Sequence, residues 1–281
     1  MADLKIVSSG LDWLTTTAVD GMTAKLLLRE AESIAREEAK RGFYLKPWKQ
    51  SGYTGFACGR IQHGERHDSA IVRLTSDLAD SEWWRCYQIT ERATRVDVQL
   101  TFKPRCGPNR FIHRINRELQ RHYRNYKKHP RITMWSNSDG GLTLYLGARS
   151  SAVYFRCYNK EVESAHVEFE GCVRMEIEFK DCAVAPLMSF LFANLPTREF
   201  ACKVVTSFAA EHGISSFPVT VNPPSYYEGQ PSVTDELKSL TWLSSQVKPS
   251  VLELVRRGRL QDVINNLGLK DCVVVCPTTQ D

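Results

Sequence analysis

The chain has 281 residues, a net charge of +5, 42% hydrophobic residues and 25% charged residues. This is the composition of a globular protein that is long enough to bury a full core. No apolar run approaches the roughly 20 residues of a membrane helix, and the first residues lack the basic-then-apolar profile of a secretory signal, so we expect a cytosolic protein with no membrane partner. The nine cysteines include no CxxC pair, which favours buried thiols in a reducing compartment over a zinc site.

The positive charge is concentrated in one segment. Residues 103–131 contain ten Lys or Arg residues and one acidic residue, whereas the rest of the chain contains 27 basic and 31 acidic residues. A local excess of this kind indicates a binding site for an anionic partner more than a general property of the protein.

The first third of the chain predicts a mixture of strands and one helix. Residues 11–17 are aromatic and β-branched, as is typical of a strand. Thr23 can cap a helix that runs to about Lys40, and short strands are predicted at 52–59 and 70–74. Neighbouring tryptophans at 83 and 84 predict a buried segment. The inward face of the helix is predicted to carry Leu26, Leu27, Ile34 and Ala35.

Residues 94–102 alternate cleanly between apolar and polar side chains, which predicts a strand with one buried face. Asp97 lies on its polar face, next to Arg95 and Gln99. A proline and a Gly-Pro pair then end the strand.

A helix is predicted from Asn109 to about Lys128, with two distinct faces. Its apolar residues fall in one sector of about 120°, and its basic residues fall in another of about 80°. Like charges four residues apart repel one another, so this basic ridge favours a nucleic-acid partner, with a solvated basic face as the alternative. The candidate DNA-binding residues of the ridge are Arg110, Arg114, Arg117, Arg121, Arg124 and Lys128.

Three apolar-alternating segments between residues 141 and 180 carry the candidate chemistry. Tyr154, Arg156 and Tyr158 share one side of a strand, because strand side chains alternate between two faces. Arg174, Glu176 and Glu178 share one side of a later strand. A tyrosine beside cations and carboxylates can attack a phosphodiester.

Asp97, Glu176 and Glu178 are candidate ligands of Mg²⁺ or Mn²⁺, since hard cations prefer oxygen donors. The alternative is that cross-strand cations simply neutralise these acids. Tyr158 is the candidate nucleophile, with Arg156 and Lys160 stabilising developing charge. For this tyrosine, packing is the alternative explanation. Tyr154 is its rival on the same face, and the chain lacks the His-x-His pair of many nicking enzymes.

The last third of the chain predicts helices at 184–193 and 197–211. Prolines, glycine and serines then break all periodicity from residue 215 onward. We therefore predict a catalytic and DNA-binding domain at 1–214, a linker at 215–232 and a C-terminal helical segment at 233–281. The predicted fold class is α+β, with an antiparallel-rich central sheet and flanking helices.

Five segments together resemble the Rep_trans family of rolling-circle replication initiation proteins, found on plasmids, filamentous phages and mobile elements. The resemblance spans about residues 10–265, and its specificity lies in the order and spacing of the segments. They read LDWL from residue 11, RVDV from 95, LYLGARSS from 144, FRCYNK from 155 and VRMEIE from 173.

The resemblance implies a metal-dependent enzyme that nicks and rejoins one DNA strand through a 5′-phosphotyrosine intermediate. It assigns the nucleophile to Tyr158, metal ligation to Asp97 and Glu176, with Glu178 less secure, and phosphate stabilisation to Arg156 and Lys160. It also implies an origin hairpin with a single-stranded nick site as substrate, a possible homodimer, and helicase and polymerase partners in a bacterial host cytosol. Arg149, in the predicted turn after residue 147, is a further DNA-binding candidate.

One departure from the family pattern concerns the ligand set. Family members often carry a second aspartate four residues after the first, and here that position is Thr101. This favours, as a second hypothesis, a non-catalytic sequence-specific DNA-binding regulator derived from the same fold. An RNA-binding module is a third hypothesis, but the sequence lacks an aromatic platform of the RNP kind.

Overall fold

The computed structural model describes residues 5–164, 166–192 and 197–217. All of them belong to the first of two units into which the chain divides, Met1–Tyr226. The predicted helical segment 233–281, and the predicted linker beyond residue 217, lie outside the described residues. Within the described part, no helix is both long and apolar enough to span a membrane.

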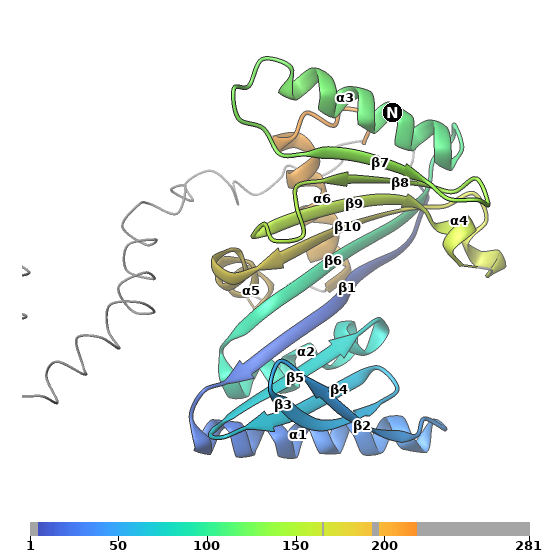
Figure 1. The fold of residues 1–281 in the computed structure, drawn as a ribbon. Helices are drawn as coiled ribbons and strands as arrows, with labels where there is room; N and C mark the ends of the chain where they lie inside the picture. The colour runs from blue at the N-terminus through green and yellow to red at the C-terminus, as the bar shows by residue number, and fades with distance from the viewer. Residues whose placement is uncertain (1–4, 165, 193–196, 218–281) are drawn as a thin grey trace, which may run out of the picture. The chain divides into compact units, whose positions relative to one another are not determined.

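The core of the fold is one ten-stranded sheet in which every neighbouring pair of strands is antiparallel (Figure 1). The strand order is β2-β3-β4-β5-β1-β6-β10-β9-β8-β7, so β1 and β6 join an N-terminal meander to a C-terminal one. The strands are β1 (Lys5–Ala18), β2 (Leu45–Gln50), β3 (Tyr53–Cys58), β4 (Ile61–Arg66), β5 (Ser69–Thr75), β6 (Ala93–Lys103), β7 (Ile132–Ser136), β8 (Leu142–Leu146), β9 (Val153–Asn159) and β10 (Val173–Lys180).

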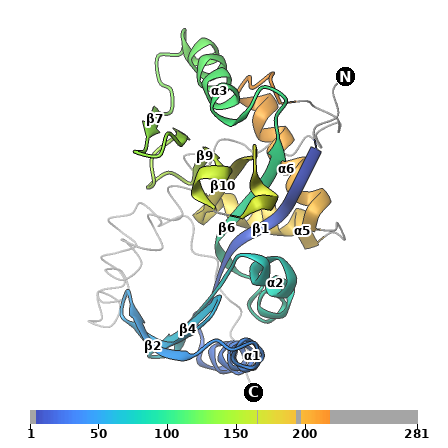
Figure 2. The same cartoon turned by 90° about the vertical axis from the view of Figure 1, so that its right-hand side faces the viewer.

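The long helices cover one face of this sheet. They gather on the same side of the strands when the sheet is viewed from its edge (Figure 2). The short α4 extends from the end of β9 (Figure 1). The helices are α1 (Gly21–Lys40), α2 (Asp77–Thr90), α3 (Pro108–Tyr123), α4 (Lys160–Glu163), α5 (Val184–Phe192) and α6 (Thr197–Glu211).

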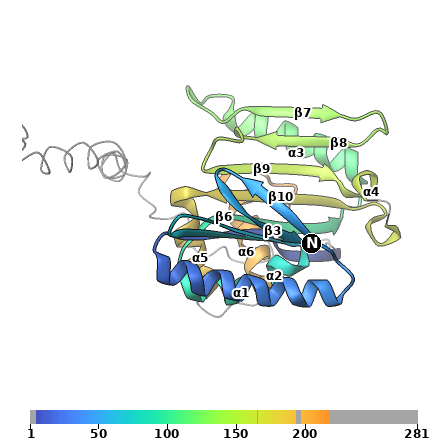
Figure 3. The ribbon, with the colours of Figure 1, turned by 60° about the horizontal axis from the view of Figure 1, so that its bottom comes forward.

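The alternation of β6 explains why the two faces differ. Its apolar side chains are fully buried on the helical side, where α5 and α6 pack, and its polar side chains point to the other face. The strand β10 beside β6, and β9 beside β10, follow the same pattern (Figure 3). The predicted α+β class with a central antiparallel sheet and flanking helices is confirmed. Among the described residues, the face opposite the helices carries no helix of more than one turn, and we call it the open face.

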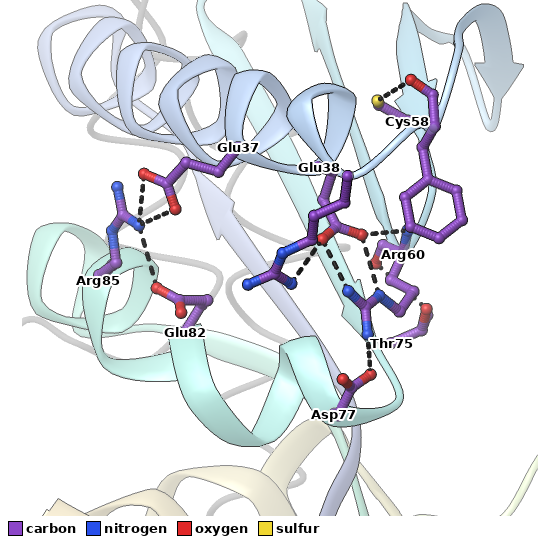
Figure 4. Close-up of polar contacts among 10 residues, drawn as sticks. Glu37, Glu38, Cys58, Arg60, Thr75, Asp77, Glu82 and Arg85 are labelled. Carbon is purple, nitrogen blue, oxygen red and sulfur yellow. Dashed lines mark hydrogen bonds and ion pairs between the residues drawn. The ribbon is translucent and has the colours of Figure 1, made fainter.

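A buried ion-pair network joins α1, α2 and the meander (Figure 4). Glu38 on α1 is 0% exposed and accepts hydrogen bonds from the Arg60 guanidinium at 2.8 and 2.9 Å. Arg60 also pairs with Asp77 at the start of α2, and Arg41 pairs with Glu38 at 3.0 Å. The hydrogen bonds from Arg60 lower the pKa of Glu38 despite its burial.

Replacing Glu38 with glutamine should lower the free energy of unfolding by about 3 kcal/mol, because it leaves Arg60 without its buried counter-charge. Since the folded-state pKa of Glu38 is lowered, the loss should be largest above the ordinary glutamate pKa of 4.5 and vanish in acid. Urea titration at neutral and acidic pH measures it. Glu37→Gln is the control: its half-exposed pair with Arg85 at 3.2 Å should contribute less than about 1 kcal/mol.

Several predictions about helix ends and burial were wrong. Thr23, predicted to cap the first helix, lies inside α1, whose N-cap is Asp20. The predicted helix 109–128 ends at Tyr123, so Lys128 lies outside it and Arg124 is its C-cap. Beyond that point Tyr126 is 54% exposed, so no buried side chain stabilises a further turn. Leu26 was predicted to face inward but is 47% exposed, and Trp84, predicted to be buried, lies on α2 with 48% exposed.

Candidate active site

The register of three central strands brings the candidate residues together on the open face. In the β10–β6 pair Glu178 lies opposite Asp97, and in the β10–β9 pair Glu176 lies opposite Arg156. Arg174 lies opposite Tyr158. Opposed side chains on one face of an antiparallel pair are direct neighbours, so sheet pairing alone creates a cluster of alternating charge.

Tyr158 and Glu176 form the closest contact of this cluster. The Tyr158 hydroxyl donates a hydrogen bond of 2.5 Å to Oε1 of Glu176, and Arg156 forms an ion pair with the other carboxylate oxygen. Glu176 is only 2% exposed. Burial, and then the negative charge of Glu176, raise the pKa of Tyr158 well above its ordinary value, while Arg174 opposes the shift. The phenol therefore stays protonated in this state and points at a proton acceptor.

Asp97 occupies a second buried position, one strand away. It is 1% exposed and accepts two hydrogen bonds from the Arg95 guanidinium, at 2.8 and 2.6 Å. Burial raises the pKa of Asp97 to about 6, although Arg95 acts against this. Arg95 itself lies 4.5 Å from the ring centroid of Trp13 and 3.2 Å from Glu178. The carboxyl of Asp97 therefore loses its proton near pH 6, and an additional positive charge would stabilise its ionised form.

A cleft of about 760 Å³ opens over these residues. Its described lining contains as many cations as carboxylates, so the charges balance. The cations are Arg95, Arg156, Lys160 and Arg174, and the acids are Asp12, Asp97, Glu163 and Glu176. Cations fixed beside carboxylates in an open cleft can stabilise charge that develops in a transition state.

Arg174 and Asp12 are two of the cleft residues that were not predicted as site residues. Arg174 donates a 2.8 Å hydrogen bond to the hydroxyl of Thr101, and its Nη1 lies 3.5 Å from Oδ1 of Asp12. Arg174 therefore connects β1, β6 and β10. The position where the family often has a second aspartate is held by a buried threonine bound to this arginine. The sequence offered one indication for Asp12, because it is an acidic residue between apolar residues of a predicted strand, in the LDWL segment.

The other predicted residues lie at varied distances from Tyr158 and Glu176. Lys160 begins α4 and pairs with Glu163, and its ammonium lies 5.9 Å from the ring centroid of Tyr158. Glu178 pairs with Arg95 and Lys180 and is not among the residues that line the cleft. Tyr154, the rival nucleophile, stacks on Tyr145 with the centroids 5.7 Å apart and lines a separate cleft.

The donor chemistry of the cleft fits a hard divalent cation only in part. Asp97 and Glu176 are buried carboxylates on adjoining strands, and burial raises the pKa of both. The charge of Asp12, which also lines the cleft, raises the pKa of Glu176, so Asp12 is a further candidate ligand. In the conformation described, each acid is paired with an arginine, and no three potential ligands among the described residues converge. A cation would have to displace those arginines.

The predicted DNA-binding residues divide between the two sides of the sheet. α3 packs on β7, β8 and β9 through buried side chains such as Ile112 and Ile115, on the helical side. The four arginines of the ridge within α3 are exposed. The ridge therefore lies on the far side of the sheet from Tyr158. Arg149, in the β8–β9 turn, lines a cleft with Trp135 and Tyr154.

Comparison with known proteins supports the resemblance found in the sequence. The sequence model of the family described as replication initiation factor matches residues 107–214, which confirms the resemblance for the segment from α3 to α6. This segment contains Tyr158 and Glu176, whereas Asp12 and Asp97 precede it. A solved structure of a rolling circle replication initiator protein from Geobacillus stearothermophilus is similar in fold, with a TM-score of 0.50 and 19% identity over 74% of this chain and 85% of that chain. No curated protein sequence matches significantly.

Proposed function

We propose that this protein initiates rolling-circle replication by nicking and rejoining one strand of DNA at an origin through Tyr158. The observation that carries the proposal is the 2.5 Å hydrogen bond from the Tyr158 hydroxyl to the buried Glu176, on the wall of an open cleft that holds four cations. The match of residues 107–214 to a replication initiation factor family supports the same reaction class.

In the proposed reaction the Tyr158 oxygen attacks the phosphorus of the scissile phosphodiester. Glu176 orients the hydroxyl and accepts its proton, and a phosphorus–oxygen bond to tyrosine forms while the bond to the 3′ oxygen breaks. The leaving 3′ oxygen takes up a proton from water in the open cleft. Arg156 and Arg174 lie next to the tyrosine and stabilise the charge on the phosphoryl oxygens. The products are a 5′-phosphotyrosine and a free 3′-hydroxyl that can prime synthesis, and the reverse reaction rejoins the strand.

The raised pKa of Tyr158 explains why such a site benefits from a metal ion. A Mg²⁺ or Mn²⁺ ion held by Asp97 and Glu176 would polarise the phosphate and favour the phenolate. We propose Asp12 as a third ligand of this ion. Glu178, the third candidate from the sequence, is the alternative. The variants Asp12→Asn and Glu178→Gln, made separately, test which of the two acids affects the dependence of nicking on Mn²⁺ concentration.

Incubation with Mn²⁺ and supercoiled DNA that bears the origin tests the proposed function. Relaxed circles, together with a covalent adduct on a labelled origin hairpin whose linked peptide contains Tyr158, are the expected result. The non-catalytic regulator, favoured by Thr101, predicts specific binding of the same DNA with no change in its topology. A possible homodimer, and the host helicase and polymerase expected as partners, are proposals that follow from the same function.

We further propose that the α3 ridge binds duplex DNA of the origin. Arg117→Ala combined with Arg121→Ala should lower the salt slope of duplex binding by about two phosphate contacts, because each neutralised phosphate releases counterions. The slope is measured from binding titrations at several salt concentrations. Arg29→Ala on α1, an exposed arginine outside the ridge, is the control. An unchanged slope in the double variant would remove α3 from the interface.

The affinity for Mn²⁺ should rise with pH through about 6, which is the pKa of Asp97, and level off above it. The reason is that the protonated acid cannot ligate the ion, so binding below this pH must release a proton. Calorimetric titration in two buffers of different ionisation enthalpy counts that proton. The Asp97→Asn variant should lose both the proton release and most of the affinity. Affinity that stays flat from acidic to neutral pH would exclude Asp97 as a ligand.

A further inference from the structure

The open face carries two more clefts beside the central one. The first, of about 430 Å³, lies toward the N-terminal meander and is lined by residues of β1, β2, β4, β5, β6 and β10. It shares Trp13, Gln62 and Arg95 with the central cleft, so the two adjoin. We call it the Trp48 subsite, after the tryptophan that β2 contributes.

The second flanking cleft, also of about 430 Å³, lies over β7, β8 and the β8–β9 turn. It shares Tyr145 with the central cleft. We call it the Trp135 subsite, after the tryptophan of β7. The two subsites therefore adjoin the central cleft, and in the order of the strands Tyr158 lies between Trp48 and Trp135. The strands that carry them lie in one sheet (Figures 1 and 3).

Both subsites present aromatic rings held by neighbouring groups. Trp135 is 65% exposed, and next to it Tyr145 and Tyr154 stack with an interplanar angle of 15°. In the Trp48 subsite, the Arg73 guanidinium lies 5.1 Å from the ring centroid of Trp48. Trp135 is thus an exposed ring and Trp48 a partly exposed one, and nucleobases stack on accessible aromatic faces whatever their sequence.

The charges of the subsites differ from those of the central cleft. In the central cleft, cations and carboxylates balance. The Trp48 subsite is lined by three cations and one acid, Asp181, and the Trp135 subsite by two cations and no acid. Among the described residues, Arg73, Arg131 and Arg149 form no ion pair with a carboxylate. Arg73 is bound instead by the neutral Gln50. Uncompensated cations next to aromatic platforms are the arrangement that binds a single-stranded nucleic-acid backbone and its bases.

We propose that a single strand of DNA crosses the open face, with the nucleotides on the two sides of the nick bound in the Trp48 and Trp135 subsites. This inference rests on the proposed function for the position of the nick. It assigns the single strand to the open face, whereas the α3 ridge on the other side of the sheet is left for duplex DNA. Bases stack on Trp48 and Trp135, and phosphates pair with Arg73 on one side and with Arg131 and Arg149 on the other.

The test measures binding of a fluorescein-labelled oligothymidylate about 20 nucleotides long, by anisotropy and with divalent cations chelated. Trp48→Ala and Trp135→Ala should each weaken binding at least about fivefold, which is the lower end of the effect of losing one stacked base. Trp48→Phe should restore most of the loss. Arg73→Gln should reduce the salt slope by about 0.7, the value for one phosphate of a single strand.

The controls are Trp84→Ala on α2, a half-exposed tryptophan on the helical side, and Arg29→Gln on α1. Circular dichroism melting verifies that each variant is folded. If folded Trp48→Ala and Trp135→Ala variants bind like Trp84→Ala while the wild type nicks origin DNA, the strand path is overturned and the proposed function stands. If the tryptophans govern binding but the wild type forms no adduct, the strand path stands and the nicking function fails.

Discussion

Tyr158→Phe should abolish the covalent DNA adduct, with nicking of supercoiled DNA reduced at least about 1,000-fold. The variant lacks only the attacking oxygen, and its ring still fills the space on β9. Its affinity for origin DNA should therefore remain close to that of the wild type. Denaturing gels of a labelled hairpin incubated with Mn²⁺ measure the adduct, and anisotropy measures the binding.

The matched control for this experiment is Tyr154→Phe, on the same strand and the same face. Tyr154 lies outside the central cleft and stacks on Tyr145, so the loss of its hydroxyl should leave adduct formation within a few-fold of wild type. An adduct that persists in Tyr158→Phe and disappears in Tyr154→Phe would reverse the assignment of the nucleophile.

Glu176→Gln should produce the second large effect, a loss of nicking of about 100- to 10,000-fold. The amide keeps the size of the side chain but can neither accept the proton of Tyr158 nor hold a cation with a negative charge. Single-turnover nicking measures the loss. Removing this carboxylate also leaves Arg156 without its counter-charge, so thermal unfolding must be followed in parallel.

Glu163→Gln provides a control for the charge balance of the cleft. Glu163 lines the cleft and pairs with Lys160, but it lies on α4 and is about half exposed. Its loss should change nicking by only a few-fold. If a folded Glu176→Gln variant nicked as well as Glu163→Gln, Glu176 would have no role in activating Tyr158 and the proposed reaction would have to be abandoned.

The position of α3 changes how DNA binding is understood. The sequence predicted that the basic ridge, shortly before the tyrosine in the chain, binds nucleic acid. The structure places α3 on the helical side of the sheet, because its apolar side chains pack on the faces of β8 and β9 that point away from the cleft. A ridge and a cleft on opposite sides of one sheet cannot bind the same short stretch of a single strand.

Much of the fold was predictable where strand alternation is strong. β6, β9 and β10 each bury one apolar face. The polar side chains that alternate with the apolar ones were therefore assigned correctly to the opposite face of each strand. β2 and β4 were not predicted, because they contain Pro47, Gly64 and several charged residues. Those strands are stabilised by pairing with β3 and β5. The helix α2 was not predicted because its hydrophobic periodicity is weak. It is stabilised by packing on β1.

The sequence by itself determined which side chains share a face of their own strand, and therefore that Tyr158, Arg156, Glu176 and Asp97 could act together. It also determined the two faces of α3. Only the tertiary structure decided which strands are neighbours, that Asp12 and Arg174 complete the cleft, and that the ridge lies behind it. The physical reason is distance along the chain. Periodicity is a local property of the backbone, whereas strand pairing joins residues such as Trp13 and Asp97, or Asp97 and Glu178, that are far apart in sequence.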